Sequence, residues 1–189
     1  MDKNRFLVDF DTANIETERH DVVIIGSGIA GVYTALEISA GYDVAILTKE
    51  SIDISNSVLA QGGIAVSLDK GDSPQLHFKD TIYAGAGLCD EDSVWVLVNE
   101  AASNIDCLCK FGVNFDTKNT GELALGREAA HSKNRIIHAG DTTGKEVCDK
   151  LIAAVRTRDN IIIKERTFAV DLLTDGNACV GVLAFDECR

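Results

Sequence analysis

The chain has 189 residues, 46% of them hydrophobic, with 16 glycines and one proline, a composition typical of a single globular domain. Its net charge of −12 argues against a nucleic-acid partner, because binding to phosphate backbones depends on clustered Lys and Arg side chains. We expect no membrane span, since no apolar run reaches about 18 residues, and a cytoplasmic protein, since residues 1–20 lack the regions of a secretory signal.

The six cysteines do not predict a metal site. They are scattered without the paired C-x-x-C spacing of zinc ligands, and we interpret them as reduced thiols. Cys107 and Cys109 come nearest to a ligand pair. On a helix, residues two apart point about 200° away from each other, so these two thiols are not expected to share an ion.

Residues 1–20 are expected to form an N-terminal arm, followed by a strand–turn–helix–strand unit. Val22–Ile25 is a continuous apolar run, typical of a parallel strand buried on both faces. Apolar residues at helical spacing come next, and Gly41 is placed to end this helix in the left-handed conformation. Val44–Leu47 is the second strand, and a crossover of this kind predicts that the two strands are parallel.

The middle of the chain predicts two helices. Ser73 and Pro74 supply the N-cap and the first-turn proline of one helix. Asp92 or Ser93 caps a longer helix, which Gly112 closes. One face of this longer helix carries an apolar stripe that we expect to be core, formed by Val94, Leu97, Val98, Ala101, Ile105 and Leu108.

The last third of the chain predicts a strand, a loop, a helix and three more strands. Val113–Phe115 is a short strand, and the polar, glycine-rich segment 121–146 is typical of a loop that carries a functional site. Thr142 or Thr143 caps a helix that buries Val147, Leu151, Ile152 and Val155. Asp175–Gly176 is a hairpin turn between the last two of the expected strands, which are Ile161–Lys164, Phe168–Leu173 and Cys179–Phe185.

The motif that carries most information is Gly26-Ser27-Gly28-Ile29-Ala30-Gly31, which satisfies G-x-G-x-x-G between a strand and a helix. Gly26 allows the tight turn, Gly28 lets the backbone approach a pyrophosphate, and Gly31 lets the helix lie close on the sheet. The N-terminus of the helix offers N–H donors and partial positive charge to phosphates. In this context the motif predicts dinucleotide binding rather than a simple glycine turn.

The end of the second strand departs from the pattern of a nicotinamide site. An acidic residue usually lies there and binds a ribose hydroxyl, but this chain has Thr48 and Lys49, with Glu50 beyond. A threonine can hydrogen-bond a ribose and a lysine can face a phosphate, so a dinucleotide still fits. The alternative interpretation is that Lys49 and Glu50 are only solvated charges.

Together these segments resemble the flavin domain shared by the flavoprotein subunits of succinate dehydrogenase and fumarate reductase and by L-aspartate oxidase. The resemblance runs from about Asp21 to Phe185, and LAQGGIA (59–65) and REAAHSKNRIIHAGDTTG (127–144) are most similar to L-aspartate oxidase. It implies a Rossmann-like α/β FAD/NAD(P)-binding domain over 21–189, with a central parallel sheet and a C-terminal β-meander. In that family a Ser/Thr-Lys pair follows the second strand, which accounts for the missing acid.

The resemblance implies FAD, with its pyrophosphate at Ser27, Gly28, Ile29 and Ala30 and its adenosine half near Lys49. A second segment would lie along the pyrophosphate and the flavin, where small residues let backbone N–H groups approach an anion and a flat ring: Asn56, Ser57, Val58, Leu59, Ala60, Gln61, Gly62 and Gly63. In the respiratory relatives a histidine at the position of Asn56 bonds covalently to the flavin. Asparagine cannot do so, which favours the oxidase and non-covalent FAD.

Glu128 matches a glutamate that orients the substrate in L-aspartate oxidases. A carboxylate near the flavin can hold the ammonium group of an amino acid and repels a dicarboxylate that has no amine. The alternative is a surface ion pair with Arg127 or Lys133, which contributes little energy.

Four residues that follow this glutamate bear on its positioning. The family often has two glycines after the glutamate, where this chain has Ala129-Ala130. His131 and His138 could line the pocket or hydrogen-bond the backbone of the loop.

The expected activity is FAD-dependent oxidation of L-aspartate to iminoaspartate, with oxygen or fumarate as acceptor, in the quinolinate branch of NAD synthesis and with functional coupling to quinolinate synthase. Family members are much longer, and their substrate-capping domain and catalytic arginine would lie beyond Arg189. We therefore expect an N-terminal fragment that cannot turn over aspartate alone. Two alternatives are a succinate dehydrogenase-type subunit with covalent flavin and a non-catalytic flavin-binding module.

Overall fold

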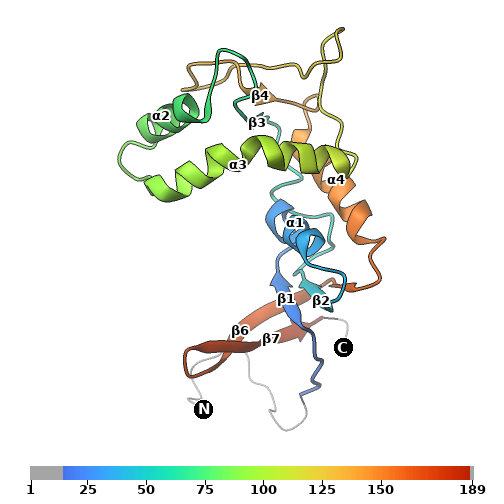
Figure 1. Ribbon diagram of the computed structural model, residues 1–189. Helices are drawn as coiled ribbons and strands as arrows, with labels where there is room; N and C mark the ends of the chain where they lie inside the picture. The colour runs from blue at the N-terminus through green and yellow to red at the C-terminus, as the bar shows by residue number, and fades with distance from the viewer. Residues whose placement is uncertain (1–14, 188–189) are drawn as a thin grey trace. The chain divides into compact units, whose positions relative to one another are not determined.

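The structure is a computed structural model that describes residues 15–187 (Figure 1). Within the described chain two compact units are present. The first combines the residues up to Ile54 with those from Val155 onward, and the second consists of Ser55–Ala154. The division into an arm over 1–20 and one domain over 21–189 stays a prediction. No helix in the described part of the chain is long and apolar enough to cross a membrane.

A three-stranded parallel sheet forms the centre of the first unit. Its strands are β1 (Val22–Ile25), β2 (Val44–Leu47) and β5 (Ile161–Lys164), in the order β1-β2-β5. Helix α1 (Ile29–Glu37) connects β1 to β2, as the sequence predicts. All four residues of β2 are buried, because the central strand of a parallel sheet has neighbours on both sides and on both faces.

Two expectations for this unit are wrong. β1 is not buried on both faces, because among the described strands it pairs only with β2; Val23 is 38% exposed and Ile25 is 52% exposed. Helix α1 does not end at Gly41. It ends at Glu37, and the next residue, Ile38, already has an extended backbone, which suits a β-branched side chain.

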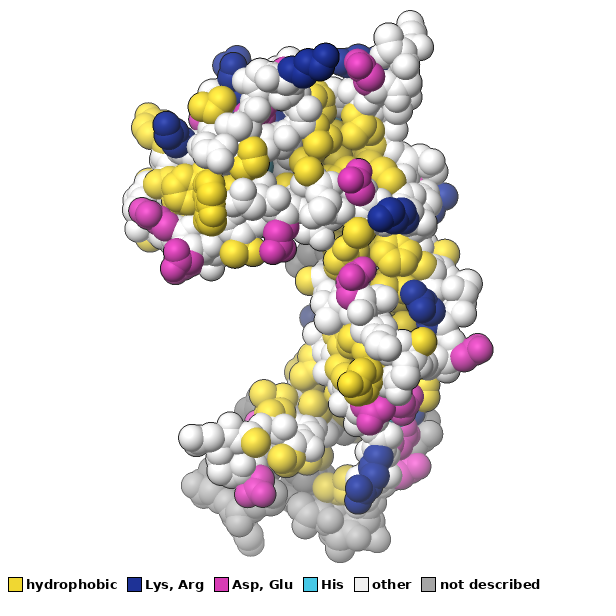
Figure 2. Space-filling model, in the orientation of Figure 1, with side chains coloured by type: hydrophobic (Ala, Val, Ile, Leu, Met, Phe, Trp, Pro, Cys, Tyr) yellow, Lys and Arg dark blue, Asp and Glu magenta, His cyan; other side chains and the backbone are white. Residues whose placement is uncertain are grey.

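An antiparallel hairpin completes the first unit, formed by β6 (Thr167–Asp175) and β7 (Ala178–Asp186). The hairpin loop is Gly176-Asn177, one residue further along than expected, with Gly176 at φ +57°, as a glycine at the first position of a type II′ turn requires. These are two strands of the expected meander. Apolar side chains lie on the visible surface of both units (Figure 2), and on this hairpin the most exposed are Phe168, Val180 and Phe185.

The second unit contains a packed pair of helices, α2 (Pro74–Ala84) and α3 (Glu91–Lys110) (Figure 1). Phe78 and Trp95 meet edge to face, with ring centroids 5.5 Å apart. The hydroxyl of Ser73 accepts a hydrogen bond from the N–H of residue 76, so the predicted cap of α2 is confirmed.

The start of α3 differs from the expectation. Its N-cap is Asp90, whose carboxylate accepts a hydrogen bond of 2.7 Å from the N–H of Ser93, and not Asp92 or Ser93. Starting at Asp90 places Glu91 and Asp92 in the first turn, where their negative charge interacts favourably with the helix dipole.

The apolar stripe of α3 is buried at Val98, Ile105 and Leu108, but Leu97 is 61% exposed, because it lies about 100° around the helix from Val98. Gly112 takes φ +90° beyond the end of α3, as predicted.

The strand expected at Val113–Phe115 is absent. Both apolar residues of this segment are buried, but the N–H of Val113 bonds to the last turn of α3 instead of to a strand, at Leu108 O. This segment is therefore buried without the ladder of backbone hydrogen bonds that would make it a strand.

A short antiparallel pair, β3 (Ile64–Ala65) and β4 (Ile136–Ile137), joins two distant segments of the second unit. Helix α4 (Thr143–Val155) follows β4. All four apolar residues predicted to form its inner face are buried.

Candidate functional site

The glycine motif forms a tight turn between β1 and α1. Gly26 takes φ +107°, and its N–H donates a hydrogen bond of 2.8 Å to the carbonyl of Leu47. A Cβ atom on Gly31 would lie 2.1 Å from the carbonyl oxygen of Gly26, so only glycine lets the helix approach the turn. Gly28 is the N-cap of α1 and places no side chain there. A backbone-lined helix N-terminus of this kind fits a pyrophosphate group.

Thr48, which stands in place of the expected acid, is part of the same turn. Its hydroxyl lies 2.9 Å from that of Ser27, and both side chains are buried. Its N–H donates to the carbonyl of Lys164, and its carbonyl accepts from Thr167. Thr48 thus ties the glycine motif to the sheet, while Lys49 is exposed. Direct contacts of these two residues with a cofactor stay predictions.

The segment Asn56–Gly63 lies in the second unit and is held by two close backbone approaches. A Cβ atom on Gly63 would lie 2.2 Å from the carbonyl oxygen of Ile137, and one on Gly144 would lie 2.0 Å from that of Ser57. Gly144 also donates a hydrogen bond of 2.9 Å to the carbonyl of Ala60. β4 and the start of α4 therefore fix this segment, and the contact of its backbone with a ligand stays a prediction.

The side chains of this segment differ in exposure. Ser57, Val58 and Gly63 are half-buried. The exposed residues are those that a cofactor could reach, namely Asn56, Leu59, Ala60, Gln61 and Gly62.

Glu128 faces His138, which follows β4. Its Oε1 atom lies 3.4 Å from Nε2 of His138, and 53% of its side chain is exposed. In the described chain the side chain that faces the carboxylate of Glu128 is thus His138, and not Arg127 or Lys133. Gly126 exchanges two hydrogen bonds with Ile136, of 2.8 and 3.0 Å, which fixes the base of the loop that carries Glu128.

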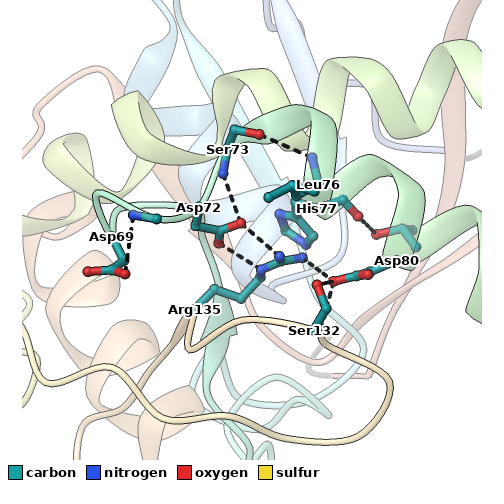
Figure 3. A network of polar contacts seen from close by, with 10 residues as sticks. Asp69, Asp72, Ser73, Leu76, His77, Asp80, Ser132 and Arg135 are labelled. Carbon is teal, nitrogen blue, oxygen red and sulfur yellow. Dashed lines mark hydrogen bonds and ion pairs between the residues drawn. The ribbon is translucent and has the colours of Figure 1, made fainter.

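A buried arginine next to this base anchors the loop (Figure 3). Arg135 has no exposed surface, and its guanidinium binds Asp72 through two hydrogen bonds of 2.9 and 2.8 Å. Its Nη1 atom also lies 2.9 Å from Asp80, an ion pair that is out of line for an N–H hydrogen bond. Asp80 in turn accepts hydrogen bonds of 2.8 Å from the N–H and the hydroxyl of Ser132.

The sequence motifs did not predict this Arg135–Asp72–Asp80 cluster. One signal was present in the sequence: Arg135 directly precedes the apolar pair Ile136–Ile137, where a charged side chain must either leave the core or find partners. The partners themselves lie 63 and 55 residues away, beyond the range of local patterns.

Two side chains at this cluster, Asp80 and His77, have lowered pKa values. Burial raises the pKa of Asp80, but the hydrogen bonds from Ser132 and the charge of Arg135 outweigh it and hold that pKa below its usual value. The pKa of His77 is lowered by burial, then by the charges of Arg135 and His131. The imidazole of His77 is therefore neutral around pH 7.

Both roles considered for His131 stay predictions, and its Nδ1 atom is buried without a hydrogen-bond partner in the described chain. Its ring packs against that of His77, with centroids 5.5 Å apart, and it also lines a cavity of about 430 Å³ beside the end of α2. No group of three or more potential ligand side chains for a metal ion occurs in residues 15–187.

The sequence of the chain is similar to those of L-aspartate oxidases. The chain is 44% identical over 167 residues to the L-aspartate oxidase of Nostoc sp., with 87% of this chain and 29% of that protein covered. It is 44% identical over 174 residues to the chloroplastic L-aspartate oxidase of Oryza sativa, covering 90% and 27%. The chain therefore spans less than a third of the length of these relatives.

A solved structure and a family match complete the comparison. Quinol fumarate reductase FrdA of Escherichia coli superposes with a TM-score of 0.88 at 26% identity, over 91% of this chain and 30% of that one. Residues 21–187 match the FAD binding domain family, which indicates FAD as the cofactor. Since the match includes most of the chain and both groups of site residues, the chain belongs to this family of FAD-binding domains.

Proposed function

We propose that this chain forms the FAD-binding part of an L-aspartate oxidase, which oxidises L-aspartate to iminoaspartate with oxygen or fumarate as electron acceptor. Bound FAD would supply the acceptor for the hydride that leaves the α-carbon. One observation carries the proposal: Glu128, His138 and Gly63 meet in one compact unit of a chain that is 44% identical to L-aspartate oxidases. We expect a cytoplasmic protein whose product supplies quinolinate and NAD synthesis through quinolinate synthase.

The residues of the first unit would bind the dinucleotide. The N-terminus of α1 offers backbone donors and partial positive charge to the pyrophosphate, and the Ser27–Thr48 hydrogen bond keeps the turn in place. Lys49 is exposed and free of the core, so it can approach the adenosine half. These residues bind and orient the cofactor without taking part in electron transfer.

The residues of the second unit would recognise the substrate. Glu128 presents a half-exposed carboxylate that can bind an ammonium group, and this negative charge disfavours a dicarboxylate that has no amine. Asn56 supports non-covalent FAD, because an amide side chain does not form the bond that a histidine forms with the flavin.

An absorption spectrum, recorded before and after acid precipitation of the purified chain, tests the cofactor part of the proposal. Oxidised-flavin bands that pass into the supernatant support non-covalent FAD. Flavin that stays in the pellet supports the succinate dehydrogenase-type alternative. A chain that takes up no flavin after incubation with FAD contradicts the assignment of a cofactor site to these residues.

Hydrogen peroxide formation from L-aspartate in air tests the activity. We expect none from the chain alone, because the match covers only 29% of the Nostoc enzyme. We expect turnover when this chain replaces the matching segment of that enzyme, and a large loss with Glu128→Gln. Glu91→Gln, at an exposed position of α3, is the matched control. An inactive chimaera that binds FAD supports a non-catalytic flavin-binding module.

A further inference from the structure

We propose that His138 is a positioning residue, which holds the carboxylate of Glu128 in the orientation that binds the ammonium group of the substrate. This inference rests on the proposed function and deepens it. Its basis is the contact of 3.4 Å between His138 Nε2 and Glu128 Oε1, together with the different freedom of the two side chains.

The imidazole ring of His138 is confined on two sides. A Cβ atom on Gly63 would lie 2.8 Å from Nδ1, and one on Gly126 would lie 3.2 Å from Nε2, so the ring occupies space that two glycines leave open. Its backbone is confined as well, because the carbonyl of His138 accepts a hydrogen bond of 2.7 Å from Asp116. Only 26% of the side chain is exposed.

The side chain of Glu128 has no such confinement, although its backbone carbonyl also accepts a hydrogen bond, of 3.2 Å, from the N–H of His131. Its side chain has three rotatable bonds and is 53% exposed, and the following residue, Ala129, takes a positive φ of +46° that L-residues rarely adopt. A contact between half-exposed groups adds little to stability, so stability does not account for this pairing. The confined ring therefore directs the mobile carboxylate, rather than the reverse.

The chemistry of the contact leaves the carboxylate available. Nε2 of the imidazole faces Oε1, and Oε2 is available to an ammonium group. The separation of 3.4 Å is longer than an ordinary hydrogen bond of about 2.7–3.2 Å, and such contacts in ligand-free sites commonly tighten when a ligand binds. His138 also touches Gly63, so it links the amine-binding group to the segment proposed to lie along the flavin.

Three substitutions of His138 separate positioning from packing. The amide nitrogen of Gln reaches the place of Nε2, that of Asn reaches the place of Nδ1, and Leu supplies neither. With the FAD-loaded chimaera in which this chain replaces the matching segment of the Nostoc enzyme, we would measure dissociation constants for L-aspartate and for succinate, which has no amine. His20→Leu is the control, because His20 also contacts a carboxylate, that of Asp43, but in the other unit.

We expect His138→Leu and His138→Asn to weaken L-aspartate binding about tenfold, and His138→Gln to stay within about threefold of the wild type. Succinate binding should change by less than about threefold in all three. Equal losses for both ligands, or no loss with His138→Leu, would overturn the proposal.

A second measurement does not depend on the substrate or on FAD. The ¹⁵N resonance of His138 Nε2, assigned by its absence in His138→Gln, should shift in Glu128→Gln and stay in place in Glu91→Gln. An unshifted resonance overturns the contact itself. If the wild type does not prefer L-aspartate to succinate, the proposed function fails, and this resonance alone decides whether His138 positions Glu128.

Discussion

The hydroxyl groups of Ser27 and Thr48 share a buried hydrogen bond, with their oxygens 2.9 Å apart. This bond joins the second residue of the glycine motif to the residue that follows β2. Because the backbone of Thr48 is also bonded to Lys164 and Thr167, the position of Ser27 is defined relative to three strands. The residue that replaces the expected acid thus holds the turn of the glycine motif in place.

Thr48→Val should lower the free energy of unfolding by about 1–3 kcal/mol, because it leaves the buried hydroxyl of Ser27 without its partner. The double variant Ser27→Ala/Thr48→Val should lose less than the sum of the two single variants, since both partners are then removed. Urea unfolding measures both effects. Thr174→Val, at an exposed position of β6, is the control, and a loss equal to that of Thr48→Val would refute the coupling.

Gly31→Ala should destabilise the chain by about 1–3 kcal/mol and weaken FAD binding, because the added methyl group must displace the Gly26 carbonyl. A Cβ there would lie 2.1 Å from that oxygen. Gly41→Ala is the matched control, since the nearest atom to a Cβ at that position lies 4.0 Å away. Thermal unfolding and flavin titration provide the two readouts, and a Gly31→Ala chain with wild-type values for both would contradict the close packing.

Local signals predicted the parts of the fold that depend on neighbouring residues. The glycine motif, the Ser73 cap and the inner face of α4 each involve residues within about one or two helical turns, so short-range chemistry defines them. Capping of α3 was predicted two or three residues too late, because Asp90, Asp92 and Ser93 are all good cap residues and the choice depends on the packing of the whole helix.

Features that depend on tertiary neighbours were not predicted. The exposure of Val23 and Ile25 follows from strand order, which an apolar run does not specify. The partners of Arg135 lie just before helix α2 (Asp72) and within it (Asp80), far away in the sequence. The contact of Glu128 with His138 depends on the Gly126–Ile136 pairing, whereas the sequence suggested a neighbouring cation. The sequence therefore indicated which residue types form the candidate site, but not which side chains contact one another.

Arg135→Met should destabilise the second unit by about 3–5 kcal/mol, because it leaves the fully buried carboxylate of Asp72 without its cation. Lys118→Met removes an exposed ion pair with Glu122 and should cost less than about 1 kcal/mol. Urea unfolding of both variants measures the contrast. Similar losses for the two would mean that the arginine cluster does not anchor the loop of Glu128.

The stability of the chain should also depend on pH through His77. Burial, then the charges of Arg135 and His131, hold the pKa of His77 below its usual value of 6.5, and the smaller effects of Asp72 and Asp80 do not reverse this. Below pH 6.5 the unfolded chain therefore binds a proton that the folded chain rejects, so stability falls as the pH drops.

His77→Phe keeps a ring of similar size against His131 and removes this titration. Its free energy of unfolding should fall less than that of the wild type between about pH 7 and pH 5, which urea titrations at several pH values would measure. The loss expected from Asp80 lies in a separate window, because its pKa is held below 3.8 and its contribution disappears only as the pH falls below that value. Parallel pH profiles for His77→Phe and wild type would show that another group carries the dependence above pH 5.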